Sequence, residues 1–207
     1  MGSDPIAINA QSHMNNDNTI KSKWNKRYSE ADDSEPQAAQ VLRDNTHLLP
    51  DTGHALDLAC GRGGNALLMA RAGLQVDAWD ISDVVVGQLQ QYADEQQLPL
   101  SASVHDAEAS PPQAGQYDVI AVSYFLDRDI IAQLIAALKP GGLIFYQTFA
   151  RAVISARGPQ SPAYRLADNE LLGLFSNLQV LVYREEIDAG DSAAGIRDEA
   201  MLIARKP

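Results

Sequence analysis

A glycine-rich loop follows the first strongly apolar segment of the chain. It reads Asp57-Leu58-Ala59-Cys60-Gly61-Arg62-Gly63-Gly64. Gly61 and Gly63 can adopt positive φ angles, and without a Cβ they let the backbone approach a bound ligand closely. The next segment has helical spacing, so its N-terminal amides would face the same space. A glycine turn after a strand also occurs for structural reasons alone, so the loop by itself leaves both interpretations open.

Two further carboxylates end the next two apolar segments. Asp80 ends the second segment, 19 positions after Gly61, and Asp106 ends the third. At such positions one acidic side chain can accept hydrogen bonds from both ribose hydroxyls, and another can accept from an adenine amino group. Each alone could be a helix-start charge or a turn residue. Together with the loop they predict a site for a ligand that contains adenosine.

Asp57 indicates which ligand this is. It lies before the glycines, where a carboxylate would repel the pyrophosphate of a dinucleotide and attract the cationic methionyl part of S-adenosylmethionine. The third glycine of the dinucleotide pattern would fall at Ala66, and alanine is tolerated there. The chain has no Tyr-x-x-x-Lys pair for hydride chemistry. We therefore predict S-adenosylmethionine as cofactor, with a nicotinamide-dependent oxidoreductase as the rival enzyme class.

Strand-like and helix-like segments alternate after Pro50. The expected strands are His54–Ala59, Gln75–Trp79, Leu100–Val104, Tyr117–Ser123, Leu143–Phe149, Leu178–Glu185 and Glu199–Arg205. The expected helices are Thr19–Tyr28, Pro36–Asn45, Asn65–Ala72, one capped by Ser82 that runs to about Gln97, Asp129–Leu138, and Leu166–Phe175 capped by Asp168. Lys139-Pro140-Gly141-Gly142 is expected to stop the helix before it.

This order predicts an α/β fold. The alternation implies a mostly parallel sheet with helices on both faces, and two final strands without a helix between them make the last strand antiparallel. We expect a Rossmann-like three-layer sandwich with a seven-stranded sheet, and ligands at the carboxyl ends of the strands. Residues 51–207 would form the S-adenosylmethionine-binding domain, and residues 14–50 an N-terminal helical segment.

Composition limits the partners. The 207 residues fit one domain, and the net charge of -11 makes nucleic acid and anionic membranes poor partners. Cys60 is the only cysteine, which fits a reducing compartment, and no apolar stretch approaches the roughly 20 residues of a membrane helix. We expect a cytoplasmic protein. Residues 1–13 resemble a cloning remnant, so the native chain is expected to begin at Met14.

Three motifs resemble those of class I S-adenosylmethionine-dependent methyltransferases. They are LDLACGRGG, AWDIS and LKPGGLIFYQTF, and the resemblance covers about residues 56–149. Within that class the chain is similar to the tellurite-resistance-type group, on AWD and on Trp24-Asn25-Lys26-Arg27-Tyr28. The resemblance implies methyl transfer to a small-molecule acceptor, with a tellurium, selenium or sulfur oxyanion as one option.

The resemblance also implies roles for individual residues. Gly61 and Gly63 would flank the methionyl group, and Asp80 would hold the ribose. Asp106 with Ala107 would line the adenine pocket, Ser123 would lie near the reacting methyl, and Arg27 and Tyr28 would close the pocket from the N-terminal helix. The expected cofactor contacts are Arg27, Tyr28, Asp57, Ala59, Cys60, Gly61, Gly63, Asp80, Ile81, Asp106, Ala107 and Ser123.

The acceptor is expected where the fourth and fifth strands end. The fourth ends in Ser123-Tyr124-Phe125-Leu126-Asp127-Arg128, which is not the Asn/Asp-Pro-Pro-Tyr/Phe motif of enzymes that methylate exocyclic or amide nitrogens. We predict that Tyr124 and Arg128 contact the acceptor. Three arginines beyond the fifth strand could bind an anion or could pair with surface acids: Arg151, Arg157 and Arg165.

Methyl transfer from a sulfonium depends mostly on alignment, and a general base is needed only if the acceptor arrives protonated. No metal is expected, because His47, His54 and His105 lack the spacing of ligands. Cys60 at a helix start could be reactive, but packing is the preferred interpretation. A protein that binds S-adenosylmethionine without turnover is the non-enzymatic alternative. The sequence leaves the oligomeric state unknown.

Overall fold

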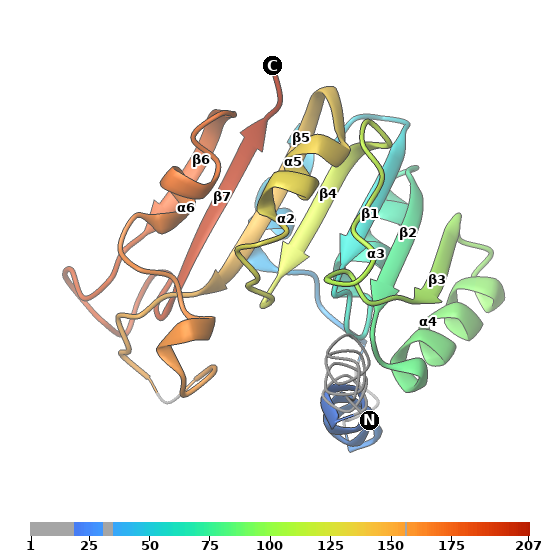
Figure 1. The fold of residues 1–207 in the computed structure, drawn as a ribbon, viewed down its shortest axis with the longest axis horizontal. Helices are drawn as coiled ribbons and strands as arrows, with labels where there is room; N and C mark the ends of the chain where they lie inside the picture. The colour runs from blue at the N-terminus through green and yellow to red at the C-terminus, as the bar shows by residue number, and fades with distance from the viewer. Residues whose placement is uncertain (1–18, 31–34, 156) are drawn as a thin grey trace, which may run out of the picture.

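One seven-stranded mixed sheet forms the centre of the computed structural model, which describes residues 19–30, 35–155 and 157–207. The strand order is β3-β2-β1-β4-β5-β7-β6 (Figure 1). Neighbours from β3 to β5 pair in parallel, whereas β7 runs antiparallel to β5 and β6. The expected fold class is confirmed. The strands are β1 (His54–Leu58), β2 (Gln75–Asp80), β3 (Leu100–Val104), β4 (Tyr117–Ser123), β5 (Leu138–Phe149), β6 (Gln179–Glu185) and β7 (Glu199–Arg205).

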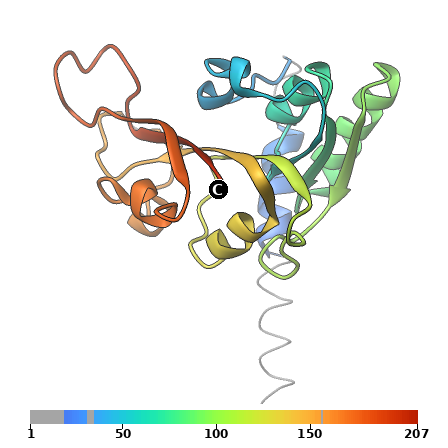
Figure 2. The same cartoon turned by 90° about the horizontal axis from the view of Figure 1, so that it is seen from above.

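Helices cover both faces of the sheet (Figure 2). Residues 19–29 are helical, and the further helices are α2 (Gln40–Arg43), α3 (Gly64–Arg71), α4 (Asp83–Glu95), α5 (Ile131–Ala137) and α6 (Glu170–Leu174), with 3-10 turns η1 (Thr46–Leu48) and η2 (Pro162–Tyr164). One apolar core joins α2, α3 and α4 to the sheet, and the other joins α5 and α6. Because successive strand side chains point to opposite faces, Ala55 enters the first core and Leu56 the second.

Several predicted element boundaries differ from the structure, and those before β5 and α6 differ by four or five residues. Strand β5 begins at Leu138, so the Lys139-to-Gly142 segment continues the strand through an irregularity in its pairing with β4. Gly141 has a φ of 81° there, and its backbone N–H donates to the carbonyl of Lys206, which lies directly after β7. Helix α6 begins only at Glu170, because Asn169 before it is left-handed, and no side chain caps the helix.

The predicted helix Pro36–Asn45 is also shorter, and this has consequences for the site. Residues 35–39 lie outside helices and strands, and α2 starts at Gln40. The amide of Ala39 binds the side chain of Asn65, and the amide of Val41 binds that of Gln147. One side chain of α3 and one of β5 therefore hold this segment, and they accept hydrogen bonds from backbone N–H groups at the start of the short helix.

The structure bears on the expectation about membrane helices but not on the one about a cloning remnant. Within the described ranges, no helix is both long enough and apolar enough to cross a membrane. The suggested cloning remnant at residues 1–13 lies outside the described residues, so it stays a prediction.

Gly64, the first residue of α3, provides a test of how tightly the 35–39 segment packs. A Cβ at Gly64 would lie 2.3 Å from the Gln37 carbonyl oxygen, whereas a Cβ at Gly87 in α4 would meet nothing within 4 Å. We expect Gly64→Ala to lower the free energy of unfolding by about 1–3 kcal/mol through overpacking. The control Gly87→Ala should raise it by about 0.5–1 kcal/mol. Urea unfolding measures both, and equal behaviour of the two variants would contradict the close contact.

Candidate functional site

The loop after β1 has the backbone conformation that its sequence predicts. Gly61 and Gly63 have φ angles of 52° and 83°, and Ala59 is also left-handed at 55°. A Cβ at Gly63 would lie 2.4 Å from Leu89 of α4, so this glycine is also needed for packing. Ala59 is the unexpected member, because a left-handed non-glycine residue is strained and such strain concentrates at functional sites.

Asp57 is fully buried at the N-terminus of α3. Its two carboxylate oxygens accept hydrogen bonds from the Asn65 amide group at 3.3 Å and from the Ala66 backbone N–H at 2.9 Å. Burial raises the pKa of Asp57 to about 7, and these two hydrogen bonds oppose the rise. The carboxylate therefore faces the start of α3, and in its ionised form it would attract a cation bound nearby.

Asp80 ends β2 and fixes the loop from the other side. Its carboxylate accepts from the backbone N–H groups of Gly61 and Ser82, each at 2.9 Å, and half-buried Ile81 lies between the partners. Burial raises the pKa of Asp80, although the backbone hydrogen bonds lower it. Ser82 caps α4 as predicted, because its oxygen accepts from the Val85 N–H.

The helix of residues 19–29 lies over this loop. A Cβ at Gly61 would come within 3.0 Å of the Tyr28 hydroxyl, and burial raises the pKa of Tyr28. Asn25 of the same helix binds both Ser82 and Asp83 at the start of α4. Arg27, by contrast, is exposed and stacks over Trp24, 5.2 Å from the ring centre. Of the two predicted closing residues, only Tyr28 faces the loop.

At the end of β3, Asp106 forms a local turn. Its Oδ1 accepts from the backbone N–H groups of Glu108 and Ala109. The preceding His105 stacks on Trp79 of β2 with ring centres 3.8 Å apart. Ala107 packs against the second core. A flat Trp79–His105 pair thus stands next to the carboxylates, and the sequence interpretation missed it.

Asn65 connects the loop to β4. Besides Asp57, its amide nitrogen binds the Ser123 hydroxyl at 3.0 Å, and its oxygen accepts from the Ala39 N–H at 2.9 Å. Ser123 therefore lies at the same edge as Asp57, as predicted for both.

Cys60 is buried in the first core, and burial raises the pKa of its thiol well above the usual range, which agrees with a packing role.

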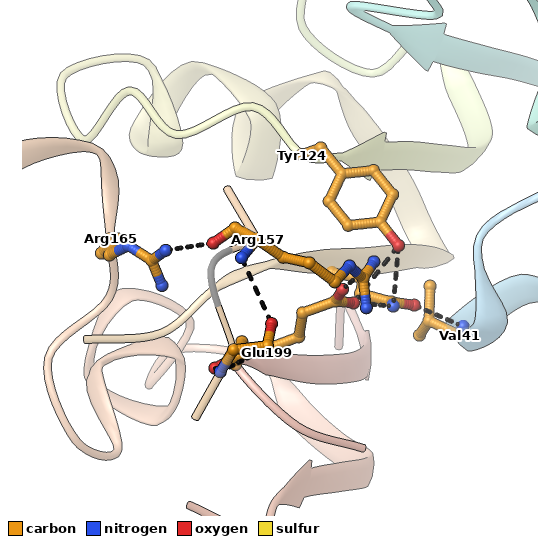
Figure 3. Close-up of polar contacts among 8 residues, drawn as sticks. Val41, Tyr124, Arg157, Arg165 and Glu199 are labelled. Atoms are coloured by element: carbon orange, nitrogen blue, oxygen red, sulfur yellow. Dashed lines mark hydrogen bonds and ion pairs between the residues drawn. The ribbon is translucent and has the colours of Figure 1, made fainter. Parts of the chain in front are cut away.

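A cavity of about 360 Å³ opens beside the end of β4. Tyr124, Gln147 and Glu199 contribute polar groups to it, and the complete lining is Gln37, Ala38, Ala39, Gln40, Arg43, Tyr124, Gln147, Arg157, Gly195, Ile196, Arg197 and Glu199. Glu199 is buried and binds Arg157 at 2.9 Å, Gln147 at 2.6 Å and the Tyr124 hydroxyl at 3.2 Å (Figure 3). The predicted acceptor residue Tyr124 thus lies in a polar cavity next to Ser123.

Arg128 does not line this cavity, and its predicted role needs correction. Its guanidinium binds the Glu170 carboxylate at 2.6 Å and 3.0 Å, and it also donates to the Ala163 and Arg165 carbonyls. These contacts hold the turn of residues 162–165 to α6. The pKa of Glu170 is lowered chiefly by this hydrogen-bonded pair. Arg128 therefore has the partners of a structural residue.

The three arginines of the loop after β5 separate in the structure. Arg157 lines the cavity, whereas Arg151 and Arg165 line a second cavity of about 320 Å³. Arg165 is buried and donates to the carbonyls of Ala150, Pro159 and Arg157 (Figure 3). The predicted cluster of Arg151, Arg157 and Arg165 thus does not form one anion site. Arg43 and Arg197 join Arg157 instead, from segments far away in the sequence.

Asn65, Gln147 and Glu199 are the polar residues that sequence reasoning missed. Gln147 stands in the apolar run LIFYQTF, and Glu199 begins the run EAMLIA. A polar side chain inside a strand that is buried on both faces is a signal in itself, because it needs a partner. The partner depends on the register of β5 and β7, and register is not visible in either strand alone.

Comparisons with known proteins agree on the kind of domain. Residues 55–142 match the family described as a methyltransferase domain. The chain is 33% identical over 141 residues to Hemagglutinin 1 of Eikenella corrodens, covering 64% of this chain and 46% of that protein. It is 27% identical over 138 residues to the probable S-adenosyl-L-methionine-dependent methyltransferase TehB of Haemophilus influenzae, covering 64% of this chain and 48% of TehB.

The fold comparison gives the same relative. The crystal structure of TehB from Haemophilus influenzae superposes with a TM-score of 0.67 at 23% identity, covering 89% of this chain and 67% of that one. The chain spans about half the length of the curated relatives it matches. The matched residues contain the glycine loop, Asp80 and Ser123. Residues 55–142 therefore match a methyltransferase domain, and the chain resembles the S-adenosylmethionine-dependent methyltransferases of the TehB group.

Proposed function

We propose that this chain transfers the methyl group of S-adenosylmethionine to a small acceptor that carries a negative charge. The observation that carries the proposal is the bridge made by Asn65, which binds Asp57 beside the glycine loop and Ser123 beside the cavity. A methyl donor held by the loop would thus have the cavity as its neighbour. Alignment of donor and acceptor is the main requirement of such a transfer.

The residues around the loop fit the donor. The Asp80 carboxylate accepts from the backbone N–H groups of Gly61, Ser82 and Ile81, and a carboxylate with about four acceptor sites can also accept from a ribose hydroxyl. The left-handed loop gives the backbone close access, and a cation bound beside Asp57 would favour the ionised form of this buried carboxyl group. S-adenosylmethionine supplies a methyl carbon on a positively charged sulfur.

The cavity supports a small anionic acceptor. Three arginines line it against one carboxylate, in a chain whose net charge is -11. Arg43 and Arg197 also donate to backbone carbonyls, whereas Arg157 projects from the loop after β5 with an exposed side chain. Guanidinium groups recognise carboxylates and oxyanions through paired N–H donors. An oxyanion or a carboxylic acid is therefore the proposed class.

A ligand panel tests the cofactor and the rival oxidoreductase together. We expect S-adenosylmethionine and S-adenosylhomocysteine, each at about 100 times its Kd, to stabilise the protein by roughly 2.7 kcal/mol. NAD and NADP should leave the unfolding temperature unchanged. Stabilisation by a nicotinamide cofactor alone would overturn the proposal. Tight binding without methyl transfer to any anionic acceptor would favour the non-catalytic alternative.

Asp80 provides the mutational test of the donor site. We expect Asp80→Asn to weaken S-adenosylhomocysteine binding by about 1.5–3 kcal/mol, because hydrogen bonds to a charged acceptor are lost. The control Asp77→Asn lies in the same strand, where Asp77 binds His54 and Tyr117. Calorimetry should find the control within a factor of two of the wild type. Equal affinities for the wild type and the Asp80 variant would contradict the ribose contact.

Arg157 provides the test of acceptor charge. In the presence of S-adenosylhomocysteine, we expect Arg157→Ala to weaken benzoate binding about tenfold or more, which is about 1.4 kcal/mol. Binding of benzamide, the neutral analogue, should change less than about twofold. Arg205→Ala is the matched control, because Arg205 ends β7 at the opposite edge and binds Gln179. Equal losses for benzoate and benzamide would show that charge is not recognised.

A further inference from the structure

Glu199 is a buried carboxylate in the wall of the cavity, with a side chain only 4% exposed. Its Oε2 accepts from Gln147 and from the Tyr124 hydroxyl, and its Oε1 accepts from Arg157 (Figure 3). An ionised carboxylate that is removed from water needs such partners. Methyl transfer to an acceptor that is already ionised would need no carboxylate there.

Tyr124 links this carboxylate to the open space. Burial and the charge of Glu199 raise the pKa of Tyr124 to about 12, so its hydroxyl is protonated at neutral pH and donates to Glu199. The residue is left-handed, with a φ of 58°, and 46% exposed. A strained tyrosine at the end of a strand persists only where its surroundings hold it. Its ring packs on Phe149, with ring centres 5.2 Å apart.

Gln147 sets the direction of the hydrogen bonds. Its side-chain oxygen accepts from the Val41 N–H at 2.7 Å, so its amide nitrogen must point toward Glu199 and Tyr124. The Tyr124 oxygen receives a long contact of 3.4 Å from Gln147 and also interacts with the Arg157 guanidinium. A donor in the cavity can therefore reach the Tyr124 oxygen when Arg157 turns away from it.

Arg157 is the exposed partner of Glu199. Its side chain is 62% exposed, so it can rotate at small cost. An anionic group in the cavity would compete with Glu199 for this guanidinium. Withdrawal of Arg157 would free Oε1 of Glu199 from its ion pair. Binding of an anion would thus leave the Glu199 carboxylate with its neutral partners Gln147 and Tyr124.

We infer that Tyr124 and Glu199 together remove a proton from the acceptor, and that the acceptor is a small carboxylic acid that also bears a protonated hydroxyl group. This inference rests on the proposed methyl transfer. The carboxylate of the acceptor binds Arg157, and its hydroxyl donates to the Tyr124 oxygen. Gln147 is a positioning residue, because it acts through Glu199 and Tyr124.

The step balances in atoms and charge. A lone pair of the acceptor oxygen forms the bond to the methyl carbon, and the carbon–sulfur bond breaks with its electron pair left on sulfur. The acceptor proton passes to the Tyr124 oxygen, and the phenolic proton passes to Oε2 of Glu199. Glu199 ends neutral, and the proton leaves to water once the product departs.

The first test reads proton transfer without turnover. The probe is 4-hydroxy-3-nitrobenzoate, whose phenol absorbs visible light strongly only when ionised. It is titrated into the complex with S-adenosylhomocysteine at a pH about one unit below the pKa of the free probe. We expect the ionised fraction of bound probe to rise at least threefold above that of free probe. In Glu199→Gln and Tyr124→Phe the bound probe should stay protonated, with a Kd within about threefold of the wild type.

The controls separate this inference from the proposed function. Asp118→Asn removes an ion-paired carboxylate at the other end of β4, where Asp118 binds Lys139 at 2.6 Å. That variant should ionise the probe as the wild type does. S-adenosylhomocysteine affinity is measured first in every protein, and its absence in the wild type would overturn the proposed function. With that affinity intact, failure of the probe to bind overturns the acceptor class. Equal ionisation in wild type and Glu199→Gln overturns the role of Glu199.

A second test uses turnover. On 4-hydroxybenzoate, whose phenol arrives protonated, we expect Glu199→Gln to lower kcat by about 10²–10⁴-fold with KM nearly unchanged. On 3,5-dinitro-4-hydroxybenzoate, whose phenol arrives ionised, kcat should change less than threefold. A purely structural role for Glu199 would lower both rates equally, and that result would overturn the inference.

Discussion

Asn65 is the residue on which the geometry of the site depends. One amide side chain holds Asp57 of β1, Ser123 of β4 and the backbone of Ala39. It is buried in the first turn of α3, directly after the left-handed loop. Because an amide has donors on one side and an acceptor on the other, it can join a carboxylate, a hydroxyl and a backbone N–H at once. The loop, the end of β4 and the 35–39 segment are therefore fixed relative to one another.

The fold was largely readable from the sequence because local and global signals agree in it. Strands β3, β4 and β7 were predicted at their observed bounds, since β4 and β7 are compact apolar runs and β3 alternates apolar residues with serine. The failures occurred where tertiary contacts override propensity. Gly141 and Gly142 indicated a stop, yet pairing with the chain end at Lys206 keeps them in the sheet. The residue pattern around Gly141 contains no information about this partner, which lies more than 60 positions later in the same chain.

The site residues also fall into those that local sequence signals predict and those that depend on tertiary contacts. The loop and Asp80 could be predicted because each follows a strand end, and parallel strands bring their ends to one edge. Arg128 was assigned by proximity in sequence to Tyr124, but its side chain reaches α6. Glu199 was not found, because its pairing with Tyr124 spans 75 positions of the chain. The contacts that β7 makes with β5 depend on the register of two distant segments, so they cannot be predicted from either segment alone.

Acidic side chains at the two ends of the sheet have pKa values shifted in opposite directions. At the far end of the sheet, burial opposes ionisation of Asp118, yet Lys139 and the His54 amide lower its pKa, so the ionised form stabilises the fold. Asp57 behaves in the opposite way. Its pKa is raised from 3.8 to about 7, so its ionisation opposes folding increasingly between these values, by about 4 kcal/mol in order of magnitude once the pH exceeds both.

An apolar residue in place of Asp57 would avoid this cost. The chain instead keeps Asp57, Asp80 and Glu199 buried at one edge, beside the strained Ala59 and Tyr124. Destabilised groups of this kind cluster where a protein binds a ligand or carries out chemistry. In the proposed reaction, the two acids near the loop lie beside the cationic donor, and the acid in the cavity accepts a proton.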